Sequence, residues 1–226
     1  MRKLSSVLSV IFVIFVVVYF FQLDSFDERN GEFSLPYSAN AQEPSEDVSA
    51  IIEMMQGDEN APVEFVEYAS FTCPHCADFH INIYPKLKID YINKGKIKFV
   101  YREVYFDRFG VWASMLARCA GPDRFFGIID ELYRKQSVWA DSSKSDIAVR
   151  KELEKIGFLA GLTDEKIDQC FQDSDKLKLL IEWFQINSET DKVKSTPSFV
   201  INGEKYPNEK DYEKLTAIID EILEKS

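Results

Sequence analysis

Two cysteines separated by two residues, Cys73-Pro74-His75-Cys76, lie where the chain changes from a strand-like to a helix-like pattern. Residues 62–72 before them are rich in Val, Phe, Tyr and Thr, which favour β structure, and a helical pattern begins at Ala77. A CxxC motif at such a junction places its first sulfur over the open N-terminus of a helix. Unpaired N–H groups and the helix dipole there favour a thiolate over a thiol. Because the thiolate is the form that attacks disulfides, this position predicts redox chemistry.

A CxxC motif is also used in metal and haem sites. A zinc site normally needs two more Cys or His ligands, and only His80 lies close by, in a C-x2-C-x3-H run without a fourth ligand. Attachment of a c-type haem needs His directly after the second cysteine, where this chain has Ala77. The sequence therefore favours redox chemistry without a metal or cofactor. A binding module for metal or thiols that uses Cys73, Cys76 and His80 stays open as the alternative.

Two stretches far apart in the chain resemble the active-site region of DsbA-type thiol–disulfide oxidoreductases of the bacterial periplasm. The first is Glu-Tyr-Ala-Ser-Phe-Thr-Cys-Pro-His-Cys at 67–76, preceded by Gly-Asp-Glu-Asn-Ala-Pro-Val at 57–63. The second is Ser-Thr-Pro-Ser-Phe-Val-Ile-Asn-Gly at 195–203. The resemblance covers residues 48–226 and implies membership of the thioredoxin superfamily. It also implies an α/β fold in which a helical domain is inserted into a thioredoxin fold.

The periodicity of apolar residues agrees with that order of elements. Residues 63–70 and 97–104 have strand patterns, and the pattern is helical from 106 to about 190. Residues 198–206 form a predicted hairpin, because Asn-Gly at 202–203 is typical of a type I′ turn, and a final helix follows. We therefore expect one thioredoxin-like domain at 48–226 with its helical insertion at about 106–190.

Composition limits the partners and the number of domains. Of the 226 residues, 46% are apolar and 14% are aromatic, which suffices for one compact domain with an insertion. The net charge of −11, without a basic patch, argues against nucleic acid as a partner, because nothing offsets repulsion by the phosphates.

The N-terminus predicts export from the cytoplasm. Arg2 and Lys3 precede an apolar run at 10–21, as in a signal peptide, and the mostly apolar stretch 4–23 is just long enough to span a bilayer. An Ala-Asn-Ala cleavage-type site follows only at 39–41, after several acidic residues. A cleaved signal peptide and an uncleaved anchor therefore both stay open.

Either kind of N-terminal segment at 1–23 places the rest of the chain outside the cytoplasm. Residues 24–47 have the composition of a linker. We expect a periplasmic domain that is soluble or tethered to the inner membrane through residues 4–23, in a compartment where disulfides persist.

Each residue of the CxxC motif has an expected role. Cys73 should be the attacking sulfur and Cys76 the resolving one. Pro74 stiffens the loop where a missing N–H costs nothing. His75 can stabilise the Cys73 thiolate, or it is an incidental polar residue. Stabilising the thiolate favours the reduced protein and so makes the disulfide a stronger oxidant. Each pKa unit corresponds to about 30 mV.

The resemblance implies roles for residues outside the motif. The peptide bond before Pro197 should be cis and lie beside the CxxC, and the Thr196 backbone should pair with an extended substrate peptide. Glu67 should lie below the buried cysteine and relay protons. Lys98 on the neighbouring strand is its expected partner, and a solvent-exposed Glu67–Lys98 pair without function is the alternative.

Cys119 and Cys170 lie on the apolar faces of two predicted helices of the insertion, so both thiols should point inward. A disulfide between them would close a loop of about fifty residues and contribute roughly 4 kcal/mol through loop-closure entropy. Two buried free thiols are the alternative.

The sequence as a whole predicts an oxidase. It would introduce disulfide bonds into exported proteins during folding by donating its Cys73–Cys76 disulfide. By resemblance, a quinone-linked membrane oxidase of the DsbB type would reoxidise it. An isomerase or reductase is the alternative, but isomerases usually carry a dimerisation domain, and residues 24–47 are too short and polar to form one. We therefore expect a monomer.

Overall fold

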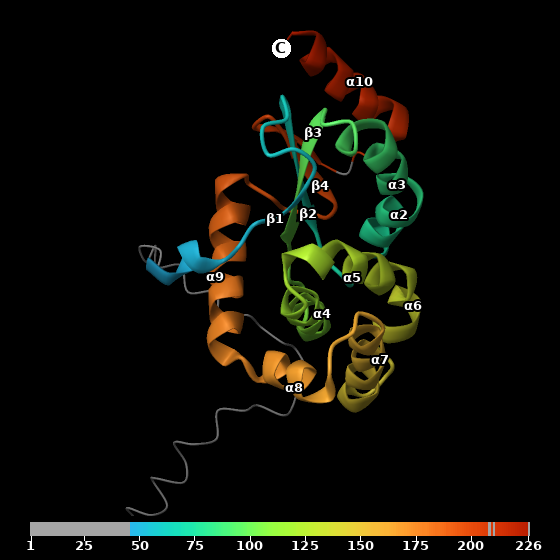
Figure 1. The fold of residues 1–226 in the computed structure, drawn as a ribbon, viewed down its shortest axis with the longest axis vertical. Coiled ribbons are helices and arrows are strands. Elements are labelled where there is room, and N and C mark those ends of the chain that lie inside the picture. The colour runs from blue at the N-terminus through green and yellow to red at the C-terminus, as the bar shows by residue number, and fades with distance from the viewer. Residues whose placement is uncertain (1–45, 208, 210, 226) are drawn as a thin grey trace, which may run out of the picture. The chain divides into compact units, whose positions relative to one another are not determined.

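The computed structural model describes residues 46–207, 209 and 211–225 (Figure 1). The predicted signal or anchor segment at 1–23, with its possible tether at 4–23, lies outside the described residues. So does the cleavage-type site at 39–41, and so does the predicted linker at 24–47 except for its last two residues. Among the described helices, none combines the length and apolar character that crossing a membrane requires.

A single sheet of five strands lies at the centre of the described part of the chain. β2 (Val63–Ala69) and β3 (Ile97–Glu103) are parallel and form its middle. β1 (Met54–Gln56) pairs antiparallel with β3, β4 (Ser198–Ile201) with β2, and β5 (Glu204–Pro207) with β4. The order across the sheet is therefore β1-β3-β2-β4-β5. The predicted strands at 63–70 and 97–104 are confirmed to within one residue.

The alternation of side chains along the strands gives the sheet two different faces. Phe65, Phe99 and Phe199 belong to the larger core cluster, under the helices α2 (Pro74–Asn82) and α10 (Tyr212–Glu224). Val66 and Val100 belong to a second cluster on the opposite face, against α9 (Ser174–Thr190). Figure 1 shows α9 along one side of the sheet and α2 on the other. Because neighbouring residues of a strand point to opposite faces, only every second residue of a strand lies on the face that α2 covers.

Helices make up most of the remaining described chain. A run of helices from residue 108 to residue 190 separates β3 from β4, which confirms the predicted helical segment at about 106–190. These helices are α4 (Arg108–Cys119), α5 (Pro122–Arg134), α6 (Gln136–Trp139), α7 (Asp146–Leu159), α8 (Asp164–Gln172) and α9. The others are η1 (Glu46–Ala50), α2, α3 (Tyr84–Leu87), the π-helix η2 (Lys88–Ile92) and α10.

Several helices of the described chain begin with a side-chain cap, whereas α2 does not. Asp107, Ser145 and Thr163 each accept a hydrogen bond from a backbone N–H in the first turn of α4, α7 and α8. The residue before α2 is Cys73, which makes no such side-chain cap, and Pro74 occupies the first turn. The start of α2 therefore leaves N–H groups available to a sulfur.

The hairpin of β4 and β5 brings the residues just before β4, which are distant in the sequence, close to the start of α2. Asn202 and Gly203 have φ values of 46° and 84°, as a type I′ turn requires. β4 pairs with β2 from Phe65↔Ile201 to Tyr68↔Ser198, so the residues just before β4 lie near the end of β2 that leads into Cys73.

Candidate active site

The two cysteines of the motif differ in exposure. Cys73 is half-buried, whereas Cys76, in the first turn of α2, is fully buried at 0% exposure. Both are free thiols in this structure. Cys73 Sγ lies 3.5 Å from the carbonyl oxygen of Thr196. Only Cys73 is therefore open to a partner from outside.

Electrostatics separate the two thiols further. A hydrogen bond from the Cys76 thiol is the main cause that lowers the pKa of Cys73 to about 5, against the opposing effect of burial. The side-chain hydroxyl of Thr196 and the backbone N–H groups of Cys76 and His75 lower this pKa further. Burial raises the pKa of Cys76, and the hydrogen bond to Cys73 and the charge of Glu67 raise it too. At neutral pH Cys73 is a thiolate and Cys76 a thiol.

The segment before β4 lies against the active sulfur. The Thr196–Pro197 peptide bond is cis, and Thr196 is 7% exposed. The Thr196 carbonyl faces Cys73 Sγ. The predicted juxtaposition of the CxxC motif with Thr-Pro is thus present in the structure, while the role of Thr196 in binding a substrate stays a prediction.

The side chains of Gln136 and Asp107, which the sequence analysis did not single out, hold the loop before α2 in place. Gln136 Nε2 donates hydrogen bonds to the carbonyl oxygens of Phe71, at 2.7 Å, and Cys73, at 2.9 Å. Thr72 Oγ1 donates to Asp107 Oδ2 at 2.6 Å, so the residue that caps α4 also fixes the residue before Cys73. No local signal marks Gln136, because its partners are backbone atoms more than sixty positions away.

Glu67 is buried on the α2 side of the sheet, but its partner is not the expected one. Its Oε2 lies 2.7 Å from Nε2 of His80, and the two side chains are 0% and 2% exposed. Lys98 instead forms an ion pair with Glu64. The prediction of a Glu67–Lys98 pair is wrong, in its relay form and in its solvent-exposed form. The reason is register: Glu64 lies opposite Lys98, whereas Glu67 lies opposite Tyr101.

The pKa of Glu67 is raised above its ordinary value, mainly by burial, while the charge and hydrogen bond of His80 act in the opposite direction. Its second carboxyl oxygen, Oε1, is buried and has no hydrogen-bond partner among the described residues. The charge of Cys73 also raises the pKa of Glu67, and the charge of Glu67 raises the pKa of Cys76. The carboxyl is therefore electrostatically coupled to both thiols.

Two further expectations concern His75 and metals. The His75 side chain is exposed, and its backbone N–H is the part that helps to lower the pKa of Cys73. A role for the imidazole stays a prediction.

Among the described residues, no group of three or more His, Cys, Asp or Glu side chains is arranged to hold a metal ion. His80, the third candidate ligand, is bonded to Glu67.

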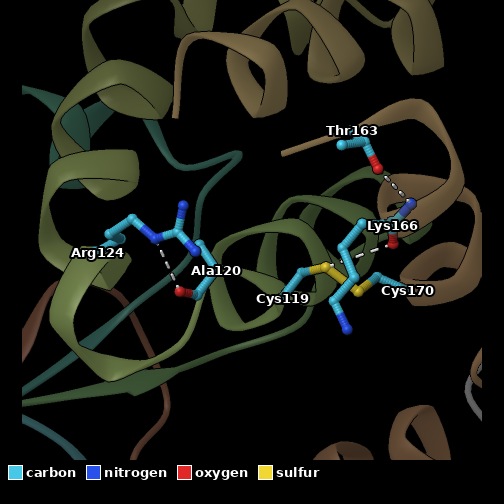
Figure 2. The surroundings of a disulfide bond; sticks show 6 residues. All are labelled: Cys119, Ala120, Arg124, Thr163, Lys166 and Cys170. Atoms are coloured by element: carbon cyan, nitrogen blue, oxygen red, sulfur yellow. Dashed lines mark hydrogen bonds between the residues drawn. A yellow bond between two sulfur atoms is a disulfide. The ribbon is translucent and has the colours of Figure 1, made fainter. Parts of the chain in front are cut away.

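Cys119 and Cys170 form a disulfide between the end of α4 and α8, with Cα atoms 5.9 Å apart (Figure 2). The carbonyl oxygen of Lys166 lies 3.6 Å from Cys119 Sγ, along a dashed line in Figure 2. This is a contact without a hydrogen bond, because a disulfide sulfur carries no hydrogen. Both cysteines are half-buried: Cys119 packs against the edge of the main core, as expected, whereas full burial of the two thiols is not observed. Cys170 stays partly exposed because α8 buries only Ile167.

Comparison with known proteins agrees with this geometry. A family model described as thioredoxin matches residues 49–221. The chain belongs to the thioredoxin family. Within this family its structure resembles that of α-DsbA1 from Wolbachia pipientis, with a TM-score of 0.71 and 27% identity over 76% of this chain and 92% of that one. The predicted thioredoxin fold with a helical insertion, of the DsbA type, is confirmed.

Curated thioredoxin-family relatives carry names from disulfide chemistry. A Rickettsia bellii protein, provisionally named protein-disulfide oxidoreductase, is 35% identical over 175 residues, which are 77% of this chain and 66% of that protein. Disulfide bond formation protein D of Bacillus subtilis is 28% identical over 182 residues, covering 74% of this chain and 75% of that one. The match spans less than two thirds of the rickettsial relatives' own length.

Proposed function

We propose that this thioredoxin-family chain is a thiol oxidase, which introduces disulfide bonds into exported proteins by donating its Cys73–Cys76 disulfide. The observation that carries the proposal is the contrast between the two thiols. A Cys73 with a pKa of about 5 is a good leaving group. Cys76 is buried, and its raised pKa keeps it protonated as a thiol. Both effects favour the reduced protein, and therefore make its disulfide oxidising.

The oxidation has two displacement steps. A substrate thiolate attacks Cys73 Sγ, the Cys73–Cys76 bond breaks, and its electron pair leaves on Cys76 Sγ, which takes a proton. A second substrate thiolate then attacks the substrate sulfur of the mixed disulfide and releases the Cys73 thiolate. The substrate dithiol is oxidised by two electrons, and the protein disulfide is reduced by two.

Neighbouring residues would assist these steps. The Thr196 backbone, beside Cys73, would pair with an extended substrate peptide next to cis-Pro197. Glu67 would supply the proton that Cys76 takes. Pro74 would keep the start of α2 rigid, and the exposed His75 would add to the stabilisation of the thiolate.

The proposal includes a place and a partner. The domain would work as a monomer in the periplasm, where a quinone-linked membrane oxidase of the DsbB type would reoxidise it. Bacillus subtilis disulfide bond formation protein D, 28% identical to this chain, bears a name that supports a role in forming disulfides.

A peptide assay separates the oxidase from an isomerase or reductase. The oxidised protein is mixed in equimolar amounts with a reduced peptide that contains two cysteines. An oxidase converts the peptide to its disulfide, and the Cys76→Ser variant does not. The reduced protein is mixed in parallel with a protein whose disulfides are scrambled. Peptide left reduced, together with efficient unscrambling, would show an isomerase instead.

A further inference from the structure

His80 forms a buried pair with Glu67 directly below the CxxC motif. Nε2 and Oε2 are 2.7 Å apart, and the side chains are 2% and 0% exposed. His80 follows Cys76 by four residues, so both lie on the same face of α2. The pair is therefore anchored to the helix that carries the buried thiol and to the strand beneath it.

Aromatic rings fix the orientation of the imidazole. It stacks on Tyr133, with ring centroids 4.4 Å apart and an angle of 19°, and Tyr84 lies 4.9 Å from it. Tyr101 meets it edge-on at 5.7 Å, and its hydroxyl lies 2.7 Å from that of Tyr133. The ring has little freedom to turn away from Glu67.

These tyrosines do not compete for protons. Burial raises the pKa of Tyr84, Tyr101 and Tyr133 above the ordinary value, so all three remain protonated near neutral pH. The charged groups beyond them have partners of their own: Glu103 pairs with Arg118 and Asp130 with Arg134. Around the pair, the described groups that can exchange a proton are thus Glu67, His80, Cys73 and Cys76.

The two oxygens of Glu67 have unequal surroundings. Oε2 meets His80, whereas Oε1 is buried without a hydrogen-bond partner among the described residues. A bare carboxylate oxygen in such a place is costly, and a proton on Oε1 removes the buried negative charge, which is the larger part of that cost. If Nε2–H donates to Oε2, the carboxyl proton is directed to Oε1.

We propose that His80 is a positioning residue that acts through Glu67: its Nε2–H holds Oε2, leaves Oε1 to carry the proton that Cys76 takes up, and sets how tightly Glu67 holds that proton. The inference rests on the thiol–disulfide exchange proposed above. When substrate opens the disulfide, the electron pair arrives on Cys76 Sγ and the proton moves from Glu67 Oε1 to that sulfur. The carboxylate left behind accepts the hydrogen bond from His80. Reoxidation returns the proton to Glu67.

The pH profile of disulfide opening tests this role. The rate at which a dithiol peptide reduces the oxidised protein is measured by stopped flow from about pH 4 to pH 9 and divided by the fraction of peptide thiolate. In the wild type this normalised rate should fall as Glu67 loses its proton. Glu67→Gln, which keeps an amide beside His80, should lower the acid-side rate by ~100-fold and remove the fall.

His80→Phe keeps the ring packing but removes the donor, so Glu67 should hold its proton more tightly. The fall in rate should therefore move to higher pH by about one unit. His80→Gln restores a donor and should return the profile toward the wild type. Glu103→Gln is the matched control, because it makes the same change in another buried pair, and its profile should not move.

An unchanged profile in Glu67→Gln, or an unchanged profile in a folded His80→Phe, would overturn the proposal, and so would equal shifts in His80→Phe and Glu103→Gln. Where His80→Phe does not fold, His80→Leu, which also lacks a donor, takes its place, and the same shift to higher pH is expected. This test does not depend on whether the protein is an oxidase. The redox potential decides the direction of catalysis, whereas the pH profile decides whether His80 acts through Glu67.

Discussion

The Sγ atom of Cys73 lies 3.5 Å from the carbonyl oxygen of Thr196, although 123 positions separate the two residues in the chain. Antiparallel pairing of β4 with β2 brings them together, since β2 leads into Cys73 and Thr196 precedes β4. A peptide that pairs with the Thr196 backbone would therefore place its own cysteine beside the reactive sulfur.

The reduced protein should be more stable than the oxidised one, by an amount that depends on pH. The pKa of Cys73 is about 5 in the folded protein, below the ordinary thiol value of about 8.5. A lowered pKa contributes stability that is fully present above the unfolded value and is lost as pH falls through the folded value. Urea unfolding of both forms at about pH 8 and pH 4 should show the difference shrinking in acid. A more stable oxidised form at pH 8 would contradict the account.

His75→Ser should make the disulfide less oxidising and raise the pKa of Cys73. The imidazole contribution is lost, whereas the backbone N–H of residue 75 remains, so the pKa should stay below that of a free thiol. Ultraviolet absorbance of the thiolate against pH measures the pKa. An unchanged pKa and potential would mean that the imidazole is a bystander.

Lys98→Met should leave the redox potential unchanged. Lys98 and Glu64 have side chains 23% and 43% exposed, and such a pair contributes at most about 1 kcal/mol to stability. Glu67→Gln serves as the comparison, because its carboxyl is buried and coupled to both thiols. A shift of the redox potential in Lys98→Met as large as that in Glu67→Gln, measured at equal pH, would contradict this. It would show that Lys98 acts together with Glu67 in spite of the strand register.

Replacing Cys119 and Cys170 together by Ala should lower the free energy of unfolding by roughly 4 kcal/mol, because the bond closes a loop across 51 positions. Peptide oxidation should persist, since these cysteines do not take part in the exchange. Alkylation of the unfolded protein without reductant, followed by mass spectrometry, tests the bond itself. Modification at both positions would show that it does not form.

Local chemistry made much of this fold predictable. The CxxC at a strand-to-helix junction, the Asn-Gly hairpin and the helical segment each depend on residues close in sequence, and the structure contains all three. The three-residue strand β1 was missed, because so short a segment has no measurable alternation.

The errors at the site come from contacts that depend on register or on distant backbone. Glu67 and Lys98 are on neighbouring strands, but the parallel register that sends them to opposite faces cannot be read from either strand alone. The four-residue spacing of Cys76 and His80 was readable and would have placed His80 under the motif. Nothing in the sequence near Gln136 points to the carbonyl of Cys73.

Equilibration with glutathione tests the central claim, that the Cys73–Cys76 disulfide is an oxidant. The protein is incubated in buffers of defined ratios of reduced to oxidised glutathione at pH 7, quenched with acid and alkylated, and the reduced fraction is measured by mass spectrometry. We predict a potential well above that of glutathione and near the value of about −120 mV known for oxidants of the DsbA type. A value near the −270 mV or so of reducing thioredoxins would contradict the account.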